Sequence, residues 1–219
     1  MLSYEIRHLP VKRGFDILFS LLALVVCSPL FLCIACLIAF TSKGKIIYGH
    51  QRIGRGGKKF NCYKFRTMYP DADQRLQHLI SENPELKKEW ESSYKLKKDP
   101  RVTPIGNFLR KTSLDELPQF WNVLKGDLSV VGPRPVVESE LIQHFKEMSG
   151  VILSVRPGIT GLWQVSGRSD TSYWKRIELD VQYIQQIKRA SKLSVRLMAL
   201  DLKLIAKTIP CMIFSKGAY

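Results

Sequence analysis

One long apolar run lies near the start of the sequence. From Ile17 to Phe40 about 24 residues carry no charge, which at about 1.5 Å per residue is long enough to cross a hydrocarbon layer of about 30 Å. The run exceeds the apolar region of a typical signal peptide, and no small-x-small cleavage pattern followed by a polar secreted domain accompanies it. We therefore expect a membrane element that is retained in the protein.

The flanks and the midpoint of this run predict its topology. Lys12–Arg13 precede it and Lys43 and Lys45 follow it, so the positive-inside tendency draws both ends to the cytoplasm. Ser28–Pro29 lies at the midpoint, where proline removes a backbone hydrogen bond and the serine hydroxyl can satisfy a freed carbonyl. These features favour a re-entrant helix that breaks at Ser28–Pro29 and returns to the same face, with a kinked span as the alternative.

Charged residues at the start of this helix are predicted to anchor it. Asp16 lies just inside the apolar boundary, three residues after Arg13, and we expect the two to pair at the headgroup level. Together with Lys12 they form the predicted helix anchor. The chain is thus divided into a membrane helix over residues 1–44 and a catalytic domain with interfacial amphipathic helices over residues 45–219.

The following segment predicts a β-hairpin. Ile46–Ile53 and Phe60–Met68 are rich in strand-forming residues, and the glycine-rich stretch 54–59 joins them. This connection lacks the Lys-Ser/Thr ending of a phosphate-binding loop, so a plain turn is expected. Lys64 and Arg66 alternate along the second strand and share one face, where they could line a phosphate site or be solvated.

Most of the remaining chain has helical patterns. Residues 71–94 read as two exposed helices separated at Asn83–Pro84, and residues 173–187 form a third. A later helix carries one leucine face and one basic face, which suits either an anionic bilayer or packing on the core, and the segment Pro210–Phe214 is expected to end it. The predicted class is α+β: a mostly helical, membrane-associated catalytic domain with a small hairpin or sheet.

The stretch 110–119 carries the clearest chemical signal. It sets two adjacent carboxylates, Asp115 and Glu116, beside basic residues where a helix should begin. Ser113 and Glu116 have capping-box spacing, and Pro118 suits a first helical turn, although a helix capped by Asp115 competes with this start. The acids could simply cap the helix, or they could serve a phosphoryl substrate and Mg²⁺.

Basic residues in stiff loops favour the second interpretation. Gly132–Pro135 holds Arg134 between two prolines, as a phosphate-binding arginine requires, although an ordinary polyproline turn has the same pattern. The stretch 156–161 repeats this device around Arg156. Arg101 lies in the proline-stiffened segment 99–104, and Arg110 follows it. The candidate substrate-binding set is Lys64, Arg66, Arg101, Arg110, Arg134 and Arg156.

Composition narrows the partners. The 219 residues include 34 Lys and Arg against 19 Asp and Glu, and the net charge of +15 implies an anionic partner such as nucleic acid, anionic lipid or a phosphorylated substrate. The cations stand in Pro/Gly turns rather than along one helix or among stacking aromatics, which disfavours nucleic acid. The five cysteines have no disulfide framework, and Cys33 and Cys36 are expected to be apolar filler rather than metal ligands.

Taken in order, these motifs resemble the bacterial sugar transferase family of monotopic phosphoglycosyl transferases. The resemblance runs from Lys12 to Tyr219 and rests on Lys12-Arg13-x-x-Asp16, Ser28-Pro29, Gln51-Arg52, Phe65-Arg-Thr-Met68, Asp99-Pro-Arg-Val-Thr103, Ser113-Leu-Asp-Glu-Leu-Pro-Gln119, Val131-Gly-Pro-Arg-Pro135 and Arg156-Pro-Gly-Ile-Thr-Gly161. The stretches 163–168 and 217–219 are most similar to the galactose-1-phosphate branch. Longer members of that branch carry a further N-terminal membrane domain, so a minimal catalytic unit is expected.

The resemblance implies a mechanism. Hexose-1-phosphate would pass from a UDP-sugar to polyprenyl (undecaprenyl) phosphate with release of UMP, Asp115 being the nucleophile and Glu116 its partner, with Mg²⁺ bound at the pair. The enzyme would lie on the cytoplasmic face of the bacterial inner membrane, in contact with membrane lipids, and a homodimer is possible. The alternatives are a membrane glycosyltransferase that releases UDP and a membrane-anchored nucleic-acid binder.

Overall fold

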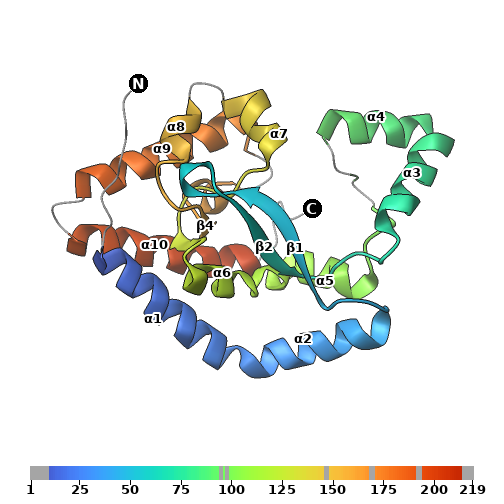
Figure 1. Cartoon of the computed structure of the whole chain (residues 1–219), viewed down its shortest axis with the longest axis horizontal. Coiled ribbons are helices and arrows are strands. Elements are labelled where there is room, and N and C mark those ends of the chain that lie inside the picture. Colours follow the sequence, from blue (N-terminus) through green and yellow to red (C-terminus); the bar gives the residue numbers. More distant parts are fainter. Residues whose placement is uncertain are drawn as a thin grey trace.

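The computed structural model describes residues 10–93, 96, 99–145, 148–167, 171–190 and 194–213. Helices surround a short hairpin and a second pair of strands, which confirms the predicted α+β class (Figure 1). The elements are, in order, α1 Pro10–Val26, α2 Ser28–Thr41, β1 Ile47–Ile53, the 3₁₀ turn η1 Arg55–Gly57, β2 Lys59–Phe65, α3 Ala72–Glu82, α4 Pro84–Ser93, α5 Pro104–Thr112, the 3₁₀ turn η2 Leu114–Glu116, α6 Gln119–Lys125, β3 Ser129–Val131, α7 Glu138–Glu140, the π-helical η3 Leu141–Phe145, α8 Ser149–Ile152, β4 Gly158–Thr160, η5 Trp163–Val165, α9 Tyr173–Ala190 and α10 Ser194–Ile213.

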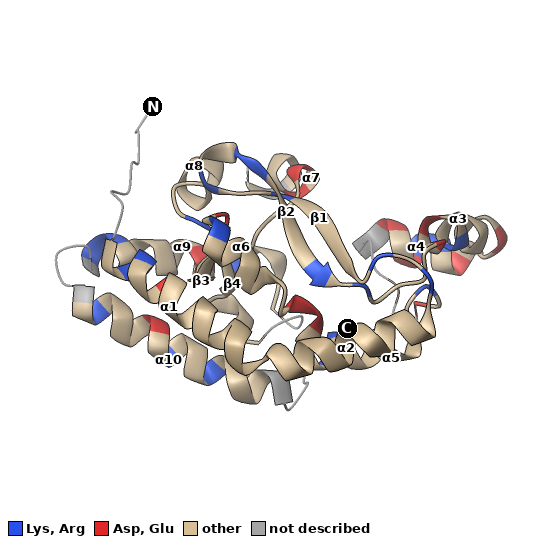
Figure 2. Ribbon diagram, turned by 60° about the horizontal axis from the view of Figure 1, so that its bottom comes forward, with Lys and Arg blue, Asp and Glu red and all other residues tan. Residues whose placement is uncertain are grey.

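The apolar run forms two helices that meet at a bend. Pro29 stands in the first turn of α2, and the Ser28 hydroxyl donates to the carbonyl of Val25 at 2.8 Å, as the sequence predicted for the break. In the described part of the chain no single helix is long and apolar enough to cross a membrane, but α1 and α2, bent by 60°, meet that test together. Figure 2 shows no charged residue along α2, and its apolar side chains Leu32 and Phe40 are exposed.

The predicted hairpin is present and its register decides which side chains share a face. β1 and β2 are antiparallel, with Arg52 opposite Phe60, His50 opposite Cys62 and Tyr48 opposite Lys64. Directly opposed residues point to the same side, so these six lie on one face. The predicted second strand was too long, because β2 ends at Phe65.

Of a second, parallel pair of strands, the sequence predicted only one. β3 matches the expected strand near residue 130, but β4 lies within the stretch 156–161, which was expected to be a stiff loop around Arg156. The two strands approach closely at Gly158, where an added Cβ would lie 2.1 Å from the backbone nitrogen of Gly132. Only glycine permits this approach, so Gly158 allows a strand to form where the prolines suggested a loop.

The main core lies between α6, β3, α9 and α10. Leu197 and Leu204 of α10 are buried in it, whereas Lys203 and Lys207 are exposed, so for this helix packing on the core is confirmed. The helix ends at Ile213, within the segment Pro210–Phe214 that was predicted to end it. Leu193, Arg168 and the motif at 217–219 lie outside the described residues.

The two exposed helices between the hairpin and the site are confirmed. α3 ends at Glu82 and α4 begins at Pro84, so the break falls at the predicted proline. They lie on the far side of the hairpin from α9 (Figure 1). The guanidinium of Arg101 stacks over the ring of Trp90 at 4.8 Å, which fastens α4 to the segment before α5.

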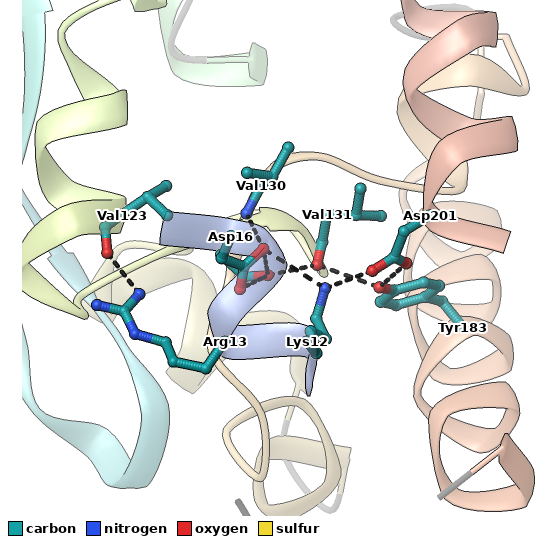
Figure 3. Close-up of polar contacts among 9 residues, drawn as sticks. Lys12, Arg13, Asp16, Val123, Val130, Val131, Tyr183 and Asp201 are labelled. Carbon is teal, nitrogen blue, oxygen red and sulfur yellow. Dashed lines mark hydrogen bonds and ion pairs between the residues drawn. The ribbon is translucent and has the colours of Figure 1, made fainter. Parts of the chain in front are cut away.

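A buried polar network ties α1 to the core, and it differs from the predicted anchor (Figure 3). Asp16 does not pair with Arg13; it is 1% exposed and accepts hydrogen bonds from the Ser129 hydroxyl at 2.8 Å and from the Val130 N–H at 3.0 Å. Lys12 lies 3.8 Å from Asp16 and 2.7 Å from Asp201 of α10. The pairing expected at the headgroup level is therefore wrong, because β3 offers buried donors that lipid cannot.

Arg13 holds a different part of the core. Its guanidinium donates to the carbonyl oxygens of Val123 at 2.6 Å and Leu124 at 2.9 Å, in the last turn of α6. A cation at a helix C-terminus satisfies carbonyls that have no partner within the helix and complements the helix dipole. The three predicted anchor residues do anchor α1, but to protein.

Candidate active site

The acidic pair lies in a short 3₁₀ turn between two helices. α5 ends at Thr112, and Ser113 takes a left-handed conformation with φ 56° as its C-cap; among described residues it is the only non-glycine residue with positive φ. The Ser113 side chain makes no capping hydrogen bond, and the next α-helix begins at Gln119. The predicted capping box is therefore wrong, because Ser113 closes the preceding helix and leaves Asp115 and Glu116 in the connecting turn.

Lys64 of β2 joins both acids. Its ammonium lies 2.6 Å from Glu116 Oε1 and 3.4 Å from Asp115 Oδ2. Asp115 is 6% exposed. A single cation held by two carboxylates keeps them close despite their like charges. Lys64, one of the predicted substrate-binding residues, therefore lies at the acidic pair.

The two carboxyl groups have opposite pKa shifts. Burial and the neighbouring Glu116 raise the pKa of Asp115, against the opposing charges of Lys64 and Arg110. Burial also acts on Glu116, but Lys64, with further help from Arg134 and Arg52, holds the pKa of Glu116 below its usual range. Two titratable groups whose pKa values are driven apart are typical of a catalytic pair. Asp115 is the more basic of the two and is the better candidate for a nucleophile.

Two predicted arginines lie within electrostatic reach of the pair. Arg110 of α5 donates through Nε to the Thr67 hydroxyl at 2.9 Å, and its charge acts on Asp115. Arg134 follows β3, and its charge acts on Glu116. Its guanidinium also lies 3.2 Å from Glu140 Oε1. Lys64 of β2 therefore contacts the acids, and the charges of Arg110 of α5 and of Arg134 in the loop after β3 act on them.

Three other predicted arginines make contacts away from the pair. Arg66 donates to the carbonyl oxygens of Lys45 and Ser42 at 2.7 Å, in the segment after α2. Arg101 is bound by both oxygens of Asp99. Arg156 donates through Nε to the carbonyl of Gly126 at 2.9 Å, beyond the end of α6. These three hold loops and helix ends in place, and among the described residues no hydrogen bond or ion pair joins Arg66 or Arg156 to the acids.

One cation near the acids was not in the predicted set. Arg52 of β1 lies on the same hairpin face as Lys64, and its charge lowers the pKa of Glu116. Its NH1 group is 3.6 Å from Glu140 Oε2. The strand register could have identified Arg52. Arg52 lies opposite Phe60 and Lys64 lies opposite Tyr48, so both side chains lie on one face of the hairpin.

The acidic pair has a donor set that suits Mg²⁺. No group of three or more His, Cys, Asp or Glu side chains gathers for a metal ion in the parts of the chain described. Mg²⁺ usually keeps several waters and takes one or two carboxylates together with substrate phosphates, rather than a cage made wholly by protein. Asp115 and Glu116, both in contact with one ammonium, could present such a pair of carboxylates.

A family comparison identifies the chain. The model for the bacterial sugar transferase family matches residues 7–215, which is nearly the whole sequence. The chain belongs to the bacterial sugar transferase family. The predicted family is confirmed, and with it the prediction of a phosphoglycosyl transferase enzyme.

Curated relatives agree with this assignment. The exopolysaccharide production protein ExoY of Sinorhizobium fredii is 48% identical over 208 residues, which are 95% of this chain and 88% of that protein. The undecaprenyl-phosphate galactose phosphotransferase of Salmonella typhimurium is 48% identical over 175 residues, 80% of this chain and 36% of that protein. The UDP-glucose:undecaprenyl-phosphate glucose-1-phosphate transferase of Escherichia coli is 39% identical over 183 residues, again 80% and 36%.

Proposed function

We propose that this bacterial sugar transferase moves hexose-1-phosphate from a UDP-sugar to undecaprenyl phosphate in two steps at Asp115. The observation that carries the proposal is the pair of buried Asp115 and partly exposed Glu116, both in contact with Lys64 and both under the charge of nearby arginines, Arg110 for Asp115 and Arg134 for Glu116. Relatives named for undecaprenyl-phosphate sugar phosphotransfer support the substrates. Both substrates are phosphate anions, so a carboxylate nucleophile can approach only where cations offset the repulsion.

In the first step a carboxylate oxygen of Asp115 attacks the phosphorus that carries the sugar. The bond from this phosphorus to the bridging oxygen breaks, UMP leaves with that oxygen and its electron pair, and an aspartyl-phosphosugar remains on the chain. Burial and Glu116 raise the pKa of Asp115, which makes its carboxylate a stronger base while Lys64 keeps it ionised. Arg110 and Arg134 would hold the phosphate oxygens.

In the second step an oxygen of undecaprenyl phosphate attacks the same phosphorus. The bond to the Asp115 oxygen breaks, the carboxylate is restored, and the lipid carries a sugar diphosphate. Asp115 and Glu116 would hold Mg²⁺, which when bound would supply Lewis-acid stabilisation of phosphoryl charge. Separating the steps lets a water-soluble donor leave before a lipid acceptor arrives.

Membrane association at the cytoplasmic face is part of the proposal. We infer that α1 and α2 form a re-entrant element, because they are bent by 60° at Ser28–Pro29 and leave large apolar side chains exposed. Lys12 and Lys43, near the two ends of the run, favour the same side of the bilayer. The acceptor phosphate could then reach the acids from the membrane while the donor enters from water.

The test uses UDP-sugar labelled in the sugar and in its phosphate. The wild-type protein incubated without acceptor should retain label in both and release UMP rather than UDP, and chelation of divalent cations should stop the release. Asp115→Asn should retain no label, while Asp71→Asn on the exposed surface serves as control. Transfer by Asp115→Asn, or release of UDP, would overturn the proposal.

A further inference from the structure

The residue Glu140 stands between two arginines, Arg52 and Arg134, whose charges also act on Glu116 of the acidic pair. Its carboxylate lies 3.2 Å from Arg134 NH1 through Oε1 and 3.6 Å from Arg52 NH1 through Oε2. The Val137 N–H donates to Oε2 at 3.1 Å, so the carboxylate is also fixed by backbone. Glu140 therefore joins the β1 strand to the loop after β3.

Both arginines are placed before any substrate binds. The side chain of Arg52 is 14% exposed and that of Arg134 34% exposed. Arg52 NH1 also donates to the carbonyl of Pro135 at 3.4 Å, and the Arg134 side chain is held by Glu140 at 3.2 Å, while its backbone N–H donates to Asp180 Oδ2 at 3.4 Å. Side chains held in this way lose little conformational entropy when they bind a ligand.

Glu140 and Glu116 both interact electrostatically with the same two cations, Arg52 and Arg134. Arg134 and Arg52 lower the pKa of both carboxyl groups, against the effect of burial. The same two arginines and Lys64 lower the pKa of His50, which burial lowers further, so His50 adds no cation at neutral pH. Two arginines shared by two carboxylates have donors left over, since each guanidinium carries five N–H groups.

We propose that Arg52 is a further ligand of a substrate phosphate, and that Glu140 is the positioning residue that holds Arg52 and Arg134 together for it. This rests on the proposed function, because it assigns residues to the same reaction. The ligand chemistry is a phosphate oxygen, which either the donor diphosphate or the lipid phosphate could supply. In the absence of substrate, Glu140 keeps two like charges close that would otherwise repel each other.

The same segment provides a matched control. Glu138, also in α7, pairs with Lys59 of β2 at 2.6 Å, and both side chains are about half exposed. This pair, like that of Glu140, joins α7 to the hairpin, but it lies among solvent. If Glu140 only fastened α7 to the hairpin, loss of either glutamate should have a similar effect.

The experiment measures the two half-reactions separately in Arg52→Lys, Arg52→Gln, Glu140→Gln and Glu138→Gln. One assay follows UMP release against UDP-sugar concentration, and the other follows transfer from the prelabelled protein against undecaprenyl phosphate. Arg52→Gln should raise KM for one substrate about 10- to 100-fold, since a charge-assisted hydrogen bond is lost, with a smaller rise for Arg52→Lys. The half-reaction that changes identifies which phosphate Arg52 binds.

Glu140→Gln should raise the same KM as Arg52→Gln, by about 3- to 10-fold, with kcat changed less, while Glu138→Gln stays within about twofold. Thermal unfolding of each variant separates loss of fold from loss of binding, and Arg52→Lys retains the charge if Arg52→Gln does not fold. An unchanged KM in Arg52→Lys and Glu140→Gln would overturn the inference. A lower KM in Glu140→Gln would also overturn it, because Glu140 would then compete with substrate. Neither result affects the proposed function, which is tested separately by labelling of the wild type, by Asp115→Asn and by the nucleotide released.

Discussion

Replacing Asp16 by alanine should destabilise the protein strongly, because it removes contacts that join α1 to β3, more than 110 residues away in the sequence. Its carboxylate accepts from the Ser129 hydroxyl at 2.8 Å and the Val130 N–H at 3.0 Å, and Lys12 lies 3.8 Å away. The side chain is 2% exposed, so water cannot replace these contacts. Asp16→Ala therefore leaves a buried N–H without its acceptor and a buried ammonium with one anion instead of two.

The structure sets the expected magnitude. Removing one partner of a buried charged pair costs about 3–5 kcal/mol, of which an unsatisfied buried donor accounts for about 1–3 kcal/mol. Lys12 keeps Asp201 at 2.7 Å, which places the cost near the lower end. For a chain of this size each kcal/mol corresponds to about 2–4 °C, so the midpoint should fall by about 6–12 °C.

The assay is thermal unfolding followed by tryptophan fluorescence, with the protein in lipid nanodiscs. Asp16→Asn keeps one oxygen for the Val130 N–H and should lose less than Asp16→Ala. Asp71→Ala removes an exposed acid paired with Arg75 and should change stability by no more than about 0.5 kcal/mol. If Asp16→Ala unfolds at the same temperature as Asp71→Ala, the network does not anchor α1 as argued.

Two further predictions concern the acids and the bend. Lys64→Gln removes the cation that lowers the pKa of Asp115, so this pKa should rise further. The ionised fraction of Asp115 then falls at low pH, and the acidic limb of the pH profile for protein labelling should move to higher pH. An unmoved limb contradicts the role of Lys64. Ser28→Ala combined with Pro29→Ala should straighten the helix pair, so that an N-terminal tag, unreachable from outside intact cells in the wild type, becomes accessible to an impermeant reagent. A wild-type tag that is already accessible would exclude the re-entrant form.

Local signals were sufficient for the elements whose ends are set by proline or by composition. The break at Ser28–Pro29, the break before Pro84 and the hairpin around the glycine-rich turn all follow from residues close in sequence. β4 was missed because its pairing with β3 joins residues about 30 apart, and the prolines beside it suggested a loop. The end of α10 at Ile213 falls within the predicted segment Pro210–Phe214, although Pro210 itself stands inside the helix.

The sequence predicted the chemistry of the site better than it predicted which residues form the site. Adjacent acids with several cations indicated the pair, and Lys64 contacts both acids while the charge of Arg134 acts on Glu116. Arg66 and Arg156 instead donate to carbonyl oxygens, in the segment after α2 and at Gly126, and no sequence motif reveals these partners. An arginine in a stiff loop can bind a ligand or can stabilise the loop itself, and its neighbours in the folded structure determine which of these it does.

The position of the acids relative to the membrane follows from one short helix. Arg13 of α1 binds the last carbonyls of α6, while η2, which carries Asp115 and Glu116, lies directly before the first turn of that helix. Seven residues at about 1.5 Å each span about 10 Å, so a short rigid rod joins the N-terminal helix to the acids. If α1 rests in the bilayer as proposed, a change in its depth must move the acids with it. The network in Figure 3 would then fix the height at which a lipid phosphate can meet Asp115.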